Sequence, residues 1–580
     1  KSQTQTLSLA PQGTKAALFT VKFVADGPAV LNWKADGGSP QLSDAVESKL
    51  NIGLAEPLLR EVNFLSLTPA TDGKNLLEGV RPEVLEGKGE VTITLSNSRA
   101  LEGAEAVEQL LHYPYGCAEQ TMSSMLPWLT LSDLKKALPS INRPDEEITL
   151  AIQKGVDRLL SMQTNQGGLA YWPGGEEANA WASAHGAVGL ILASKVAEVP
   201  QARLDSLLKW LSGSLREAAT ETGAWQMGER AYAAWALALA GKPEPAYHET
   251  LFRQREELPP YARAMLALAI AEAAGPADMA KTLLSMKGEP GKDWWLGGES
   301  TQAIRAIALM KLKDPSADGE MGRLMASRSP RGDWRNTFNN AWVLLALSRE
   351  AASAPEIKEG QPCVLTLDGK PHEIALPGKP ASESTTFKRD AETAVPQLTA
   401  KVPQGGKFYA RVEVTGRGKS GPQAARNAGF SIDRSWQRVA PDGSLSPAKE
   451  LKTGDLVLVS LDVNAPTPGE YLVIDDPLPA TMEGVNPNFG SMVAADRQGA
   501  VASWAYDHAE MRRDRMLFFR DYLDARGKFK LQYLARVIAA GNVMAPPARI
   551  EMMYDPARFG LSPSQRVTTK GSAEDGVAVK

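Results

Sequence analysis

The chain has 580 residues, of which 43% are hydrophobic and 23% charged, values that are ordinary for a globular protein. At about 150 residues per domain, this length predicts about four domains. A formal net charge of −4 without a basic run gives no reason to expect nucleic acid as a partner. Two cysteines cannot form a disulfide framework, and the apolar windows are shorter than a membrane-spanning helix requires.

The N-terminal region alternates like β-structure. "ALFTVKFVADG" and "AVLNWKADGG" each end in a turn signal, and residues 58–100 continue the pattern as far as the strand "EVTITLS". The start "KSQTQTLSLA" shows no signal peptide. Because residues 1–57 fall short of the roughly 100 residues of a β-sandwich, we expect them to be the last part of a β-domain, and the chain to be a fragment of a longer protein.

Residues 101–352 are rich in Ala and Leu and predict helices. Met122, Met125, Leu126 and Leu129 follow the i, i+3, i+4, i+7 rule for one helix face. Similar stripes recur at 145–163, 178–197, 202–219, 229–241, 259–274, 298–313 and 336–351. Glycine and tryptophan turns ("GGLAYWPGG", "GAW", "DWWLGG", "GDW") precede several of them, which indicates a degenerate repeat of helix pairs. A closed α/α toroid and an open solenoid both fit this pattern.

Strands return after the helical block. "PCVLTLDG" and "KFYARVEVTG" bracket a second β segment at 353–430. The last block, 431–580, contains "DLVLVSLDVN", "EYLVIDDPLP" and "FKLQYLARVIAAG", and its many turns predict a β-sandwich of standard size. The predicted fold class is therefore multidomain α + β, with a helical block inserted between β segments.

The stretch "HYPYGCAEQT" contains Cys117, with Gln120 three residues later. If a helix begins near Ala118, these two side chains are neighbours on its first turn, with Cβ atoms about 5–6 Å apart. A bond from the Cys sulfur to the Gln side-chain carbonyl carbon, with loss of ammonia, would give a thioester. Since a thiol leaves an acyl carbon more readily than an amide nitrogen does, an amine, a hydroxyl or water could attack it.

Other interpretations of the same residues stay open at this point. A lone cysteine is most often a small buried hydrophobic residue, and a glutamine on a first helical turn is usually solvated. A catalytic thiol is also conceivable, because a helix N-terminus lowers a thiol pKa. Glu119 lies where the helix macrodipole favours a carboxylate for structural reasons alone. Cys363, in "PCVLTL", is expected to be an ordinary thiol buried in a strand.

"YGCAEQT" resembles the thioester signature of the alpha-2-macroglobulin and complement superfamily, and "EYLVIDDPLPATMEGVN" and "IEMMYDPARFG" resemble its bacterial branch. The resemblance extends over essentially the whole chain. It implies a thioester between Cys117 and Gln120 within an α/α toroid. The implied domains are the tail of a macroglobulin-like β-domain (1–57), a split CUB-like β-domain (58–100 and 353–430), the toroidal thioester domain (101–352) and a C-terminal macroglobulin-like β-sandwich (431–580).

The resemblance also implies a function. The chain would be the trapping part of a bacterial protease inhibitor with a single-use thioester, not an enzyme, and would capture attacking proteases covalently through their amines. Bacterial relatives are periplasmic lipoproteins of a complement-like host defence, so the full-length protein is expected to be a monomer that a lipid outside this fragment anchors to the inner membrane. Neither a cofactor nor a metal is implied.

Two further positions match a lid over the thioester in bacterial relatives. These are Tyr113, four residues before Cys117, and Met553 in "EMMY". An aromatic ring and a thioether form a suitable dry cover because they are bulky and carry no nucleophile. The alternatives are an aromatic residue on a turn for Tyr113 and packing in the sandwich core for Met553. For Glu119, support of the thioester is possible beside its structural role.

Histidine is where the sequence departs from part of the family. Some complement members place a histidine in the downstream part of this domain, which redirects the acyl group to hydroxyls. The corresponding region, roughly 215–230, contains no histidine. His112 and His185 are nearer to the motif, but an imidazole on the apolar helix around His185 is more often a packed core residue. Direct attack by amines is therefore favoured.

Two other classes of function compete with this one. The first class is an enzyme built on a helical toroid. An isoprenoid enzyme of this kind needs Asp-rich or Cys/His metal ligands, and the helical block offers no such run. A glycosidase needs two suitably spaced carboxylates, and the sequence has too many candidates to exclude it. The second class is a structural or adhesive module in which Cys117 is inert.

Overall fold

The computed structural model shows that the chain folds as two compact units, one formed by residues 59–417 and the other by residues 1–58 together with 418–580. The structure describes residues 2–11, 17, 19, 21, 27–38, 42–52, 58–85, 89–113, 115–130, 134–135, 137–138, 143–217, 223–288, 297–329, 331–353, 362–367, 369–376, 381–389, 397–417, 422–485, 506–523 and 527–571. No helix in these ranges is both long and apolar enough to cross a bilayer.

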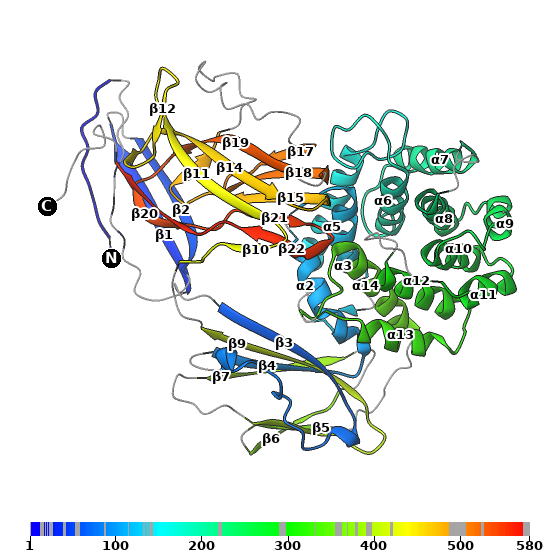
Figure 1. Cartoon of the computed structure of the whole chain (residues 1–580). Helices are drawn as coiled ribbons and strands as arrows, with labels where there is room; N and C mark the ends of the chain where they lie inside the picture. Colours follow the sequence, from blue (N-terminus) through cyan, green and yellow to red (C-terminus); the bar gives the residue numbers. More distant parts are fainter. Residues whose placement is uncertain are drawn as a thin grey trace. The chain divides into compact units, whose positions relative to one another are not determined.

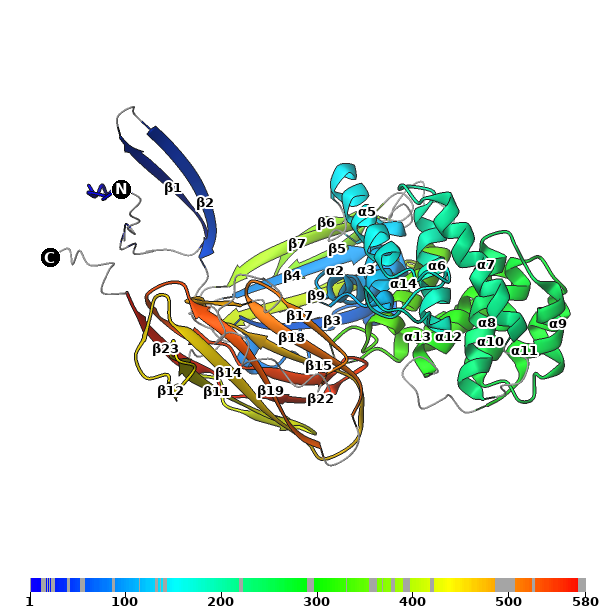
Figure 2. The ribbon, with the colours of Figure 1, turned by 90° about the horizontal axis from the view of Figure 1, so that it is seen from above.

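The helical part of the first unit is a closed double ring (Figures 1 and 2). The inner helices are α3 (Ala118–Leu129), α6 (Ala180–Ala193), α8 (Ala224–Leu239), α10 (Pro260–Glu272), α12 (Gly298–Lys311) and α14 (Thr337–Ser353). Each packs on the next, and α14 packs back on α3, which closes the ring. The α/α toroid is therefore confirmed, and the open solenoid is excluded.

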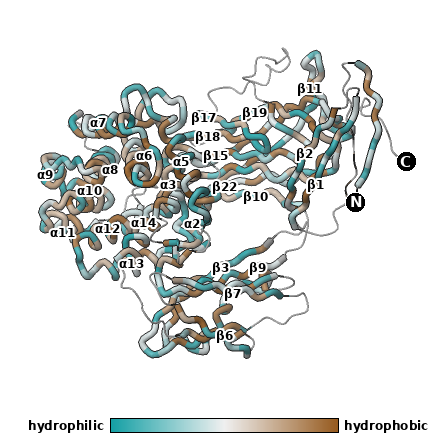
Figure 3. Tube along the Cα trace, turned by 180° about the vertical axis from the view of Figure 1, so that it is seen from behind, coloured by the Kyte–Doolittle hydropathy of each residue, from teal (hydrophilic) through white to brown (hydrophobic). Residues whose placement is uncertain are grey.

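A second layer of helices lies outside this ring. It consists of α2 (Ala104–Leu111), α5 (Asp145–Ser161), α7 (Gln201–Glu217), α9 (Pro245–Arg253), α11 (Ala277–Ser285) and α13 (Ala317–Ala326). The inner helices α6, α10 and α14 are buried on nearly every side, whereas α5 and α7 bury only one stripe, as their sequences require (Figure 3). The expected glycine and tryptophan turns bury Trp172 and Trp334, while "DWWLGG" falls mostly outside the described residues.

The toroid is inserted into a β-domain of two sheets. One sheet has the order β3 (Leu58–Leu67), β9 (Phe408–Arg417), β4 (Gly89–Ser96) and β7 (Ser382–Arg389); the other has the order β6 (Lys370–Ile374), β5 (Cys363–Leu367) and β8 (Leu398–Lys401). Ile93 of β4 pairs with Val412 of β9 and Thr385 of β7, so strands from both sides of the helical block form one sheet. Cys363 is fully buried in β5, as expected.

A cluster of charges joins this β-domain to the toroid. Glu105, on α2, accepts hydrogen bonds of 2.6 and 2.8 Å from Arg60 of β3, and of 3.0 and 2.6 Å from Arg411 of β9. Both arginines also pair with Glu413. The side chain of Glu105 is only 7% exposed, so the two arginines compensate a carboxylate that is removed from water.

The second unit contains a β-sandwich and a hairpin. One sheet has the order β10 (Arg426–Ala428), β22 (Asp555–Leu561), β21 (Arg549–Met552), β15 (Gly469–Pro477), β18 (Arg515–Leu523) and β17 (His508–Met511). The facing sheet has the order β12 (Leu445–Pro447), β11 (Ser431–Val439), β14 (Leu456–Ala465), β19 (Gly527–Val537) and β16 (Met482–Gly484). A third sheet has the order β13 (Leu451–Lys452), β23 (Gln565–Lys570) and β20 (Gly541–Ala545), and β1 (Gly27–Gly37) pairs with β2 (Leu42–Ile52).

The sandwich begins earlier than residue 431. Arg426 pairs with Leu561, and Ala428 with Phe559, so β10 extends a sheet of the sandwich although the sequence assigned residues up to 430 to the split β-domain. A three-residue strand carries too short a pattern to reveal its partner. The multidomain α + β class predicted from the sequence is confirmed.

Candidate functional site

The segment that leads into Cys117 is held from two sides. The carbonyl oxygen of Gly116 accepts hydrogen bonds of 3.1 and 2.9 Å from the guanidinium of Arg158, on α5. The backbone N–H of Ala118 donates a bond of 3.0 Å to the carbonyl oxygen of Tyr171. These contacts fix the residues on both sides of Cys117, so the start of α3 has one defined position within the toroid.

Cys117 and Gln120 form a reciprocal pair at the start of α3. Cys117 is the N-cap residue, with extended backbone angles, and its sulfur lies against the backbone N–H of Gln120. In return, the side-chain oxygen of Gln120 accepts a hydrogen bond of 3.4 Å from the backbone N–H of Cys117. This is the geometry of a capping box, in which the two side chains reach toward each other's backbone. Both residues are fully buried.

The surroundings of Cys117 disfavour a free thiolate. Burial raises the pKa of the thiol far above its ordinary value, and the charge of Glu119 raises it further. Hydrogen bonds from the backbone of Gln120 and the side chain of Tyr171 act in the opposite direction but are weaker. A catalytic cysteine requires a lowered pKa, so this environment argues against the catalytic-thiol alternative.

Glu119 is also fully buried, and each of its two carboxylate oxygens accepts a hydrogen bond. One oxygen accepts a hydrogen bond of 2.6 Å from the hydroxyl of Ser123, one turn further along α3. The other accepts a bond of 2.7 Å from the hydroxyl of Thr337, the first residue of α14. The carboxylate thus ties the reactive turn to the helix that closes the ring.

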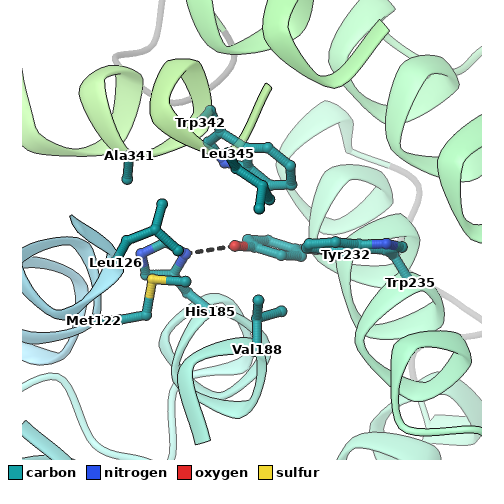
Figure 4. A pocket seen from close by; sticks show the side chains of 9 residues that line it. All are labelled: Met122, Leu126, His185, Val188, Tyr232, Trp235, Ala341, Trp342 and Leu345. Atoms are coloured by element: carbon teal, nitrogen blue, oxygen red, sulfur yellow. Dashed lines mark hydrogen bonds between the residues drawn. The ribbon is translucent and has the colours of Figure 1, made fainter. Parts of the chain in front are cut away.

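His185 lies next to the first turn of α3, and both of its ring nitrogens have hydrogen-bond partners. Its Nε2 is 3.3 Å from the hydroxyl of Ser123, its ring hydrogen-bonds the backbone of Glu119, and its Nδ1 meets the hydroxyl of Tyr232 (Figure 4). The ring stacks on Trp181 at a centroid distance of 5.1 Å. Burial lowers the pKa of His185 to about 3, so the imidazole is neutral. It occupies the core, as its apolar helix suggested.

The space beside His185 is too small for an organic substrate. Its lining is apolar or aromatic apart from His185 and the Tyr232 hydroxyl, and it barely accommodates one water molecule (Figure 4). The other lining residues are Met122, Leu126, Val188, Trp235, Ala341, Trp342 and Leu345. Side chains thus fill this part of the ring. The described residues also contain no group of three or more His, Cys, Asp or Glu side chains that could hold a metal ion.

The two residues predicted to form a lid belong to different units. Tyr113 is half-buried, and its ring makes an edge contact with that of Tyr115 at 5.3 Å. Met553 lies between β21 and β22, where its backbone N–H donates a bond of 2.9 Å to the carbonyl oxygen of Tyr471. The lid stays a prediction. His112 is exposed at the end of α2, where its Nδ1 lies 3.0 Å from the carbonyl oxygen of Glu108.

Four residues of the site were not found from the sequence: Ser123, Arg158, Tyr171 and Thr337. Only Ser123 left a signal, because it lies four residues after Glu119, a spacing that brings two side chains together on a helix. The other three come from α5, the loop after it and α14, and only the packing of helices α5, α6 and α14 on α3 brings them there.

Comparisons with known proteins agree with this architecture. A model of the bacterial alpha-2-macroglobulin MG10 domain matches residues 429–557, and a model of the A-macroglobulin TED domain matches residues 90–226, which include Cys117 and Gln120. The alpha-2-macroglobulin of Escherichia coli is 26% identical over 551 residues, which cover 87% of this chain and 30% of that protein. These matches identify the chain as similar to the C-terminal region of bacterial alpha-2-macroglobulin.

Other relatives support the same assignment. An alpha-2-macroglobulin homolog of Nostoc is 24% identical over 446 residues, 71% of this chain and 23% of that protein. The chain thus spans less than a third of the length of these curated relatives. It corresponds in fold to a native Escherichia coli alpha-2-macroglobulin structure that spans domain MG7 to the C-terminus, with a TM-score of 0.72, 20% identity and coverage of 94% of this chain and 88% of that one.

A Salmonella alpha-2-macroglobulin that had reacted with methylamine has the same fold. The likeness has a TM-score of 0.73 at 21% identity and covers 94% of this chain and 36% of that chain. At this level of identity, the structural likeness supports the fold and the order of domains, and the chemistry of Cys117 and Gln120 must be argued from their geometry.

Proposed function

We propose that this chain is the trapping region of a protease inhibitor, in which Cys117 and Gln120 form an internal thioester that captures proteases covalently. Members of the family are protease inhibitors rather than enzymes. The observation that carries the proposal is the buried reciprocal pair at the start of α3, where the Cys117 sulfur and the Gln120 side chain share one helical turn.

The chemistry requires two balanced steps. In the first, the Cys117 sulfur bonds to the side-chain carbonyl carbon of Gln120, and the amide nitrogen leaves as ammonia. In the second, an amine attacks the same carbon, the carbon–sulfur bond breaks, and the proton lost by the amine ends on the sulfur. Water also attacks a thioester, so the bond must be kept from water between the two steps. The complete burial of Cys117 and Gln120 supports this.

The structure favours amines over hydroxyls as acceptors. Transfer to hydroxyls through a histidine would need an imidazole nitrogen that is free to attack the acyl carbon. Both ring nitrogens of His185 are occupied by Ser123, the Glu119 backbone and Tyr232, and residues 215–230 contain no histidine. Lysine side chains of an attacking protease are therefore the proposed targets. A Salmonella relative that reacted with methylamine supports reactivity toward amines.

The remaining parts of the proposal concern the full-length protein. A bait region and a lipid anchor would lie outside this chain, and the protein would act as a monomer on the periplasmic side of the inner membrane. These statements rest on the family resemblance, because the chain spans less than a third of its curated relatives.

Intact mass measurement tests the thioester. The freshly purified chain should be lighter than its sequence mass by one ammonia, and methylamine should replace this deficit by an adduct on Gln120 while one thiol appears. Cys117→Ala should remove both effects, whereas the matched variant Cys363→Ala should retain them, because Cys363 is buried in β5. A native chain of full sequence mass whose Cys117 reacts at once with a thiol reagent would contradict the proposal.

A further inference from the structure

Glu119 is a buried charge that the proposed trapping chemistry does not use. It lies between Cys117 and Gln120 in the sequence, in the same first turn of α3, and it is fully shielded from solvent. Its two oxygens both accept hydrogen bonds, from Ser123 at 2.6 Å and from Thr337 at 2.7 Å. Two hydroxyl donors, one to each oxygen, favour the carboxylate form of a buried acid over its neutral form.

The position of this charge matters when the thioester breaks. As an amine bonds to the Gln120 carbon, the electron pair of the carbon–sulfur bond moves to the Cys117 sulfur, which becomes negative until it takes up a proton. A second negative charge within the same turn opposes this step, and it does so strongly because neither group is exposed to water. The same repulsion contributes to the raised pKa of the Cys117 thiol.

The helix macrodipole alone does not account for this arrangement. The helix macrodipole would favour a carboxylate at this position on an exposed helix as well, without anchors. Here the carboxylate is held by a hydroxyl from its own helix and by one from α14, 218 residues further along the chain. Ser123 in turn contacts His185, whose ring also hydrogen-bonds the Glu119 backbone. The surrounding residues therefore fix the carboxylate within the helical turn that Cys117 caps.

We propose that Glu119 is an electrostatic restraint on the thioester, held in place by Ser123 and Thr337, that slows every reaction in which the Cys117 sulfur leaves. The proposal rests on the proposed function and adds its regulation. The restraint lengthens the lifetime of the unused bond, since it slows water and amines alike. Ser123 and Thr337 are positioning residues, because they act only through the carboxylate.

Glu119→Gln removes the charge while keeping the shape. Because one nearby charge changes the stability of the developing thiolate, thiol release at a fixed methylamine concentration should become about ten- to a hundredfold faster than in the wild-type chain. Spontaneous hydrolysis should accelerate by a similar factor. The exposed Glu146, in the first turn of α5, provides the control, and Glu146→Gln should release thiol at the wild-type rate.

Two further variants separate charge from loosened packing. Ser123→Ala and Thr337→Val each remove one donor and keep the carboxylate, so they should accelerate thiol release by only about threefold or less. If either accelerates release as much as Glu119→Gln does, loosening explains the effect and the proposal is wrong. An unchanged or slower rate in Glu119→Gln would also overturn it, as would a Glu119→Gln chain of full sequence mass that never closes the thioester.

These outcomes are distinct from failure of the proposed function. If no thioester exists, the wild-type chain itself shows no mass deficit and no methylamine adduct. If the thioester exists but Glu119 does not restrain it, the wild-type chain shows both, and only the comparison of rates fails. After denaturation, the wild-type and Glu119→Gln chains should release thiol equally fast, because unfolding removes the fixed charge from the sulfur.

Discussion

The guanidinium of Arg158 donates two hydrogen bonds, of 3.1 and 2.9 Å, to the carbonyl oxygen of Gly116, the residue directly before Cys117. Bonds from a charged donor are stronger than those between neutral groups, so this contact is a firm attachment between α5 and the segment that enters α3. The outer helix α5 thereby controls how closely the backbone around Cys117 is packed.

Replacing Arg158 should therefore expose the site. Arg158→Ala removes both bonds, which should destabilise the toroid by about 1–3 kcal/mol and speed spontaneous thiol release several-fold. Thiol release over time, together with the melting temperature, checks this. Arg158→Lys keeps a charge but cannot donate from two nitrogens, so its rate of thiol release should lie between those of the wild-type chain and Arg158→Ala. A wild-type release rate in Arg158→Ala would show that the contact does not protect Cys117.

His185 should make the toroid sensitive to acid. Burial lowers its pKa in the folded chain to about 3, whereas an exposed histidine titrates near 6.5. The unfolded chain therefore takes up a proton below about pH 6.5 that the folded chain does not. The free energy of unfolding should fall by about 1.4 kcal/mol per pH unit as the pH drops from about 6.5 toward 3, and this contribution is constant above 6.5.

Melting temperatures at pH 7 and pH 5 test this effect of His185. The difference should shrink in His185→Gln, which cannot take up the proton. His112 is the matched control, because it is exposed, and His112→Gln should retain the wild-type difference. An equal pH dependence in wild-type and His185→Gln chains would assign the acid sensitivity to other groups.

The lid prediction can be tested by substitution, without knowledge of how the two units are arranged relative to each other. Tyr113→Ala or Met553→Ala should speed hydrolysis and methylamine incorporation several-fold, because each would admit water to an activated acyl group. Tyr113→Ala should change the melting temperature little because Tyr113 is only half-buried, whereas Met553 is 4% exposed and its truncation should also lower the stability of the second unit. Thiol-release rates equal to that of the wild type in both variants would refute the lid and leave the thioester untouched.

The charge cluster between the β-domain and α2 should contribute to stability. Glu105→Ala leaves Arg411 partly buried without its main partner, which should cost about 3–5 kcal/mol. Arg60→Ala should cost about 1 kcal/mol or less, because the side chain of Arg60 is 37% exposed and water can replace its bonds. Chemical denaturation followed by circular dichroism measures both. Equal losses in the two variants would contradict this difference in burial.

Much of the architecture was predictable because it follows from local pattern. The helix expected near Ala118 begins at that residue, and its stripe buries Met122, Met125 and Leu126. Most of the other predicted stripes agree with a helix to within a few residues. The sequence stripes do not include the short helices α2, α9, α11 and α13, because eight to ten residues on the outer layer show too little periodicity.

The site was predictable only in part, for a physical reason. Cys117 and Gln120 are three residues apart, so their proximity follows from helix geometry. Thr337 reaches this turn only because α14 packs back on α3, and Arg158 reaches Gly116 only because α5 packs on α3; no local pattern encodes either packing. The neutral state of His185 also depends on burial by distant residues, although its apolar helix had already suggested a core position.

The insertion of the toroid also sets an order of folding. Thr92 of β4 and Thr386 of β7 share a hydrogen bond of 2.9 Å, yet 294 residues separate them. During synthesis, β4 emerges long before either neighbouring strand exists, so its sheet has to wait for the complete helical block. The helices form from local contacts and can fold in the meantime, which carries the two halves of the sheet toward each other. Until then β4 is an unpaired strand, and the period of synthesis is when the chain is most exposed to aggregation.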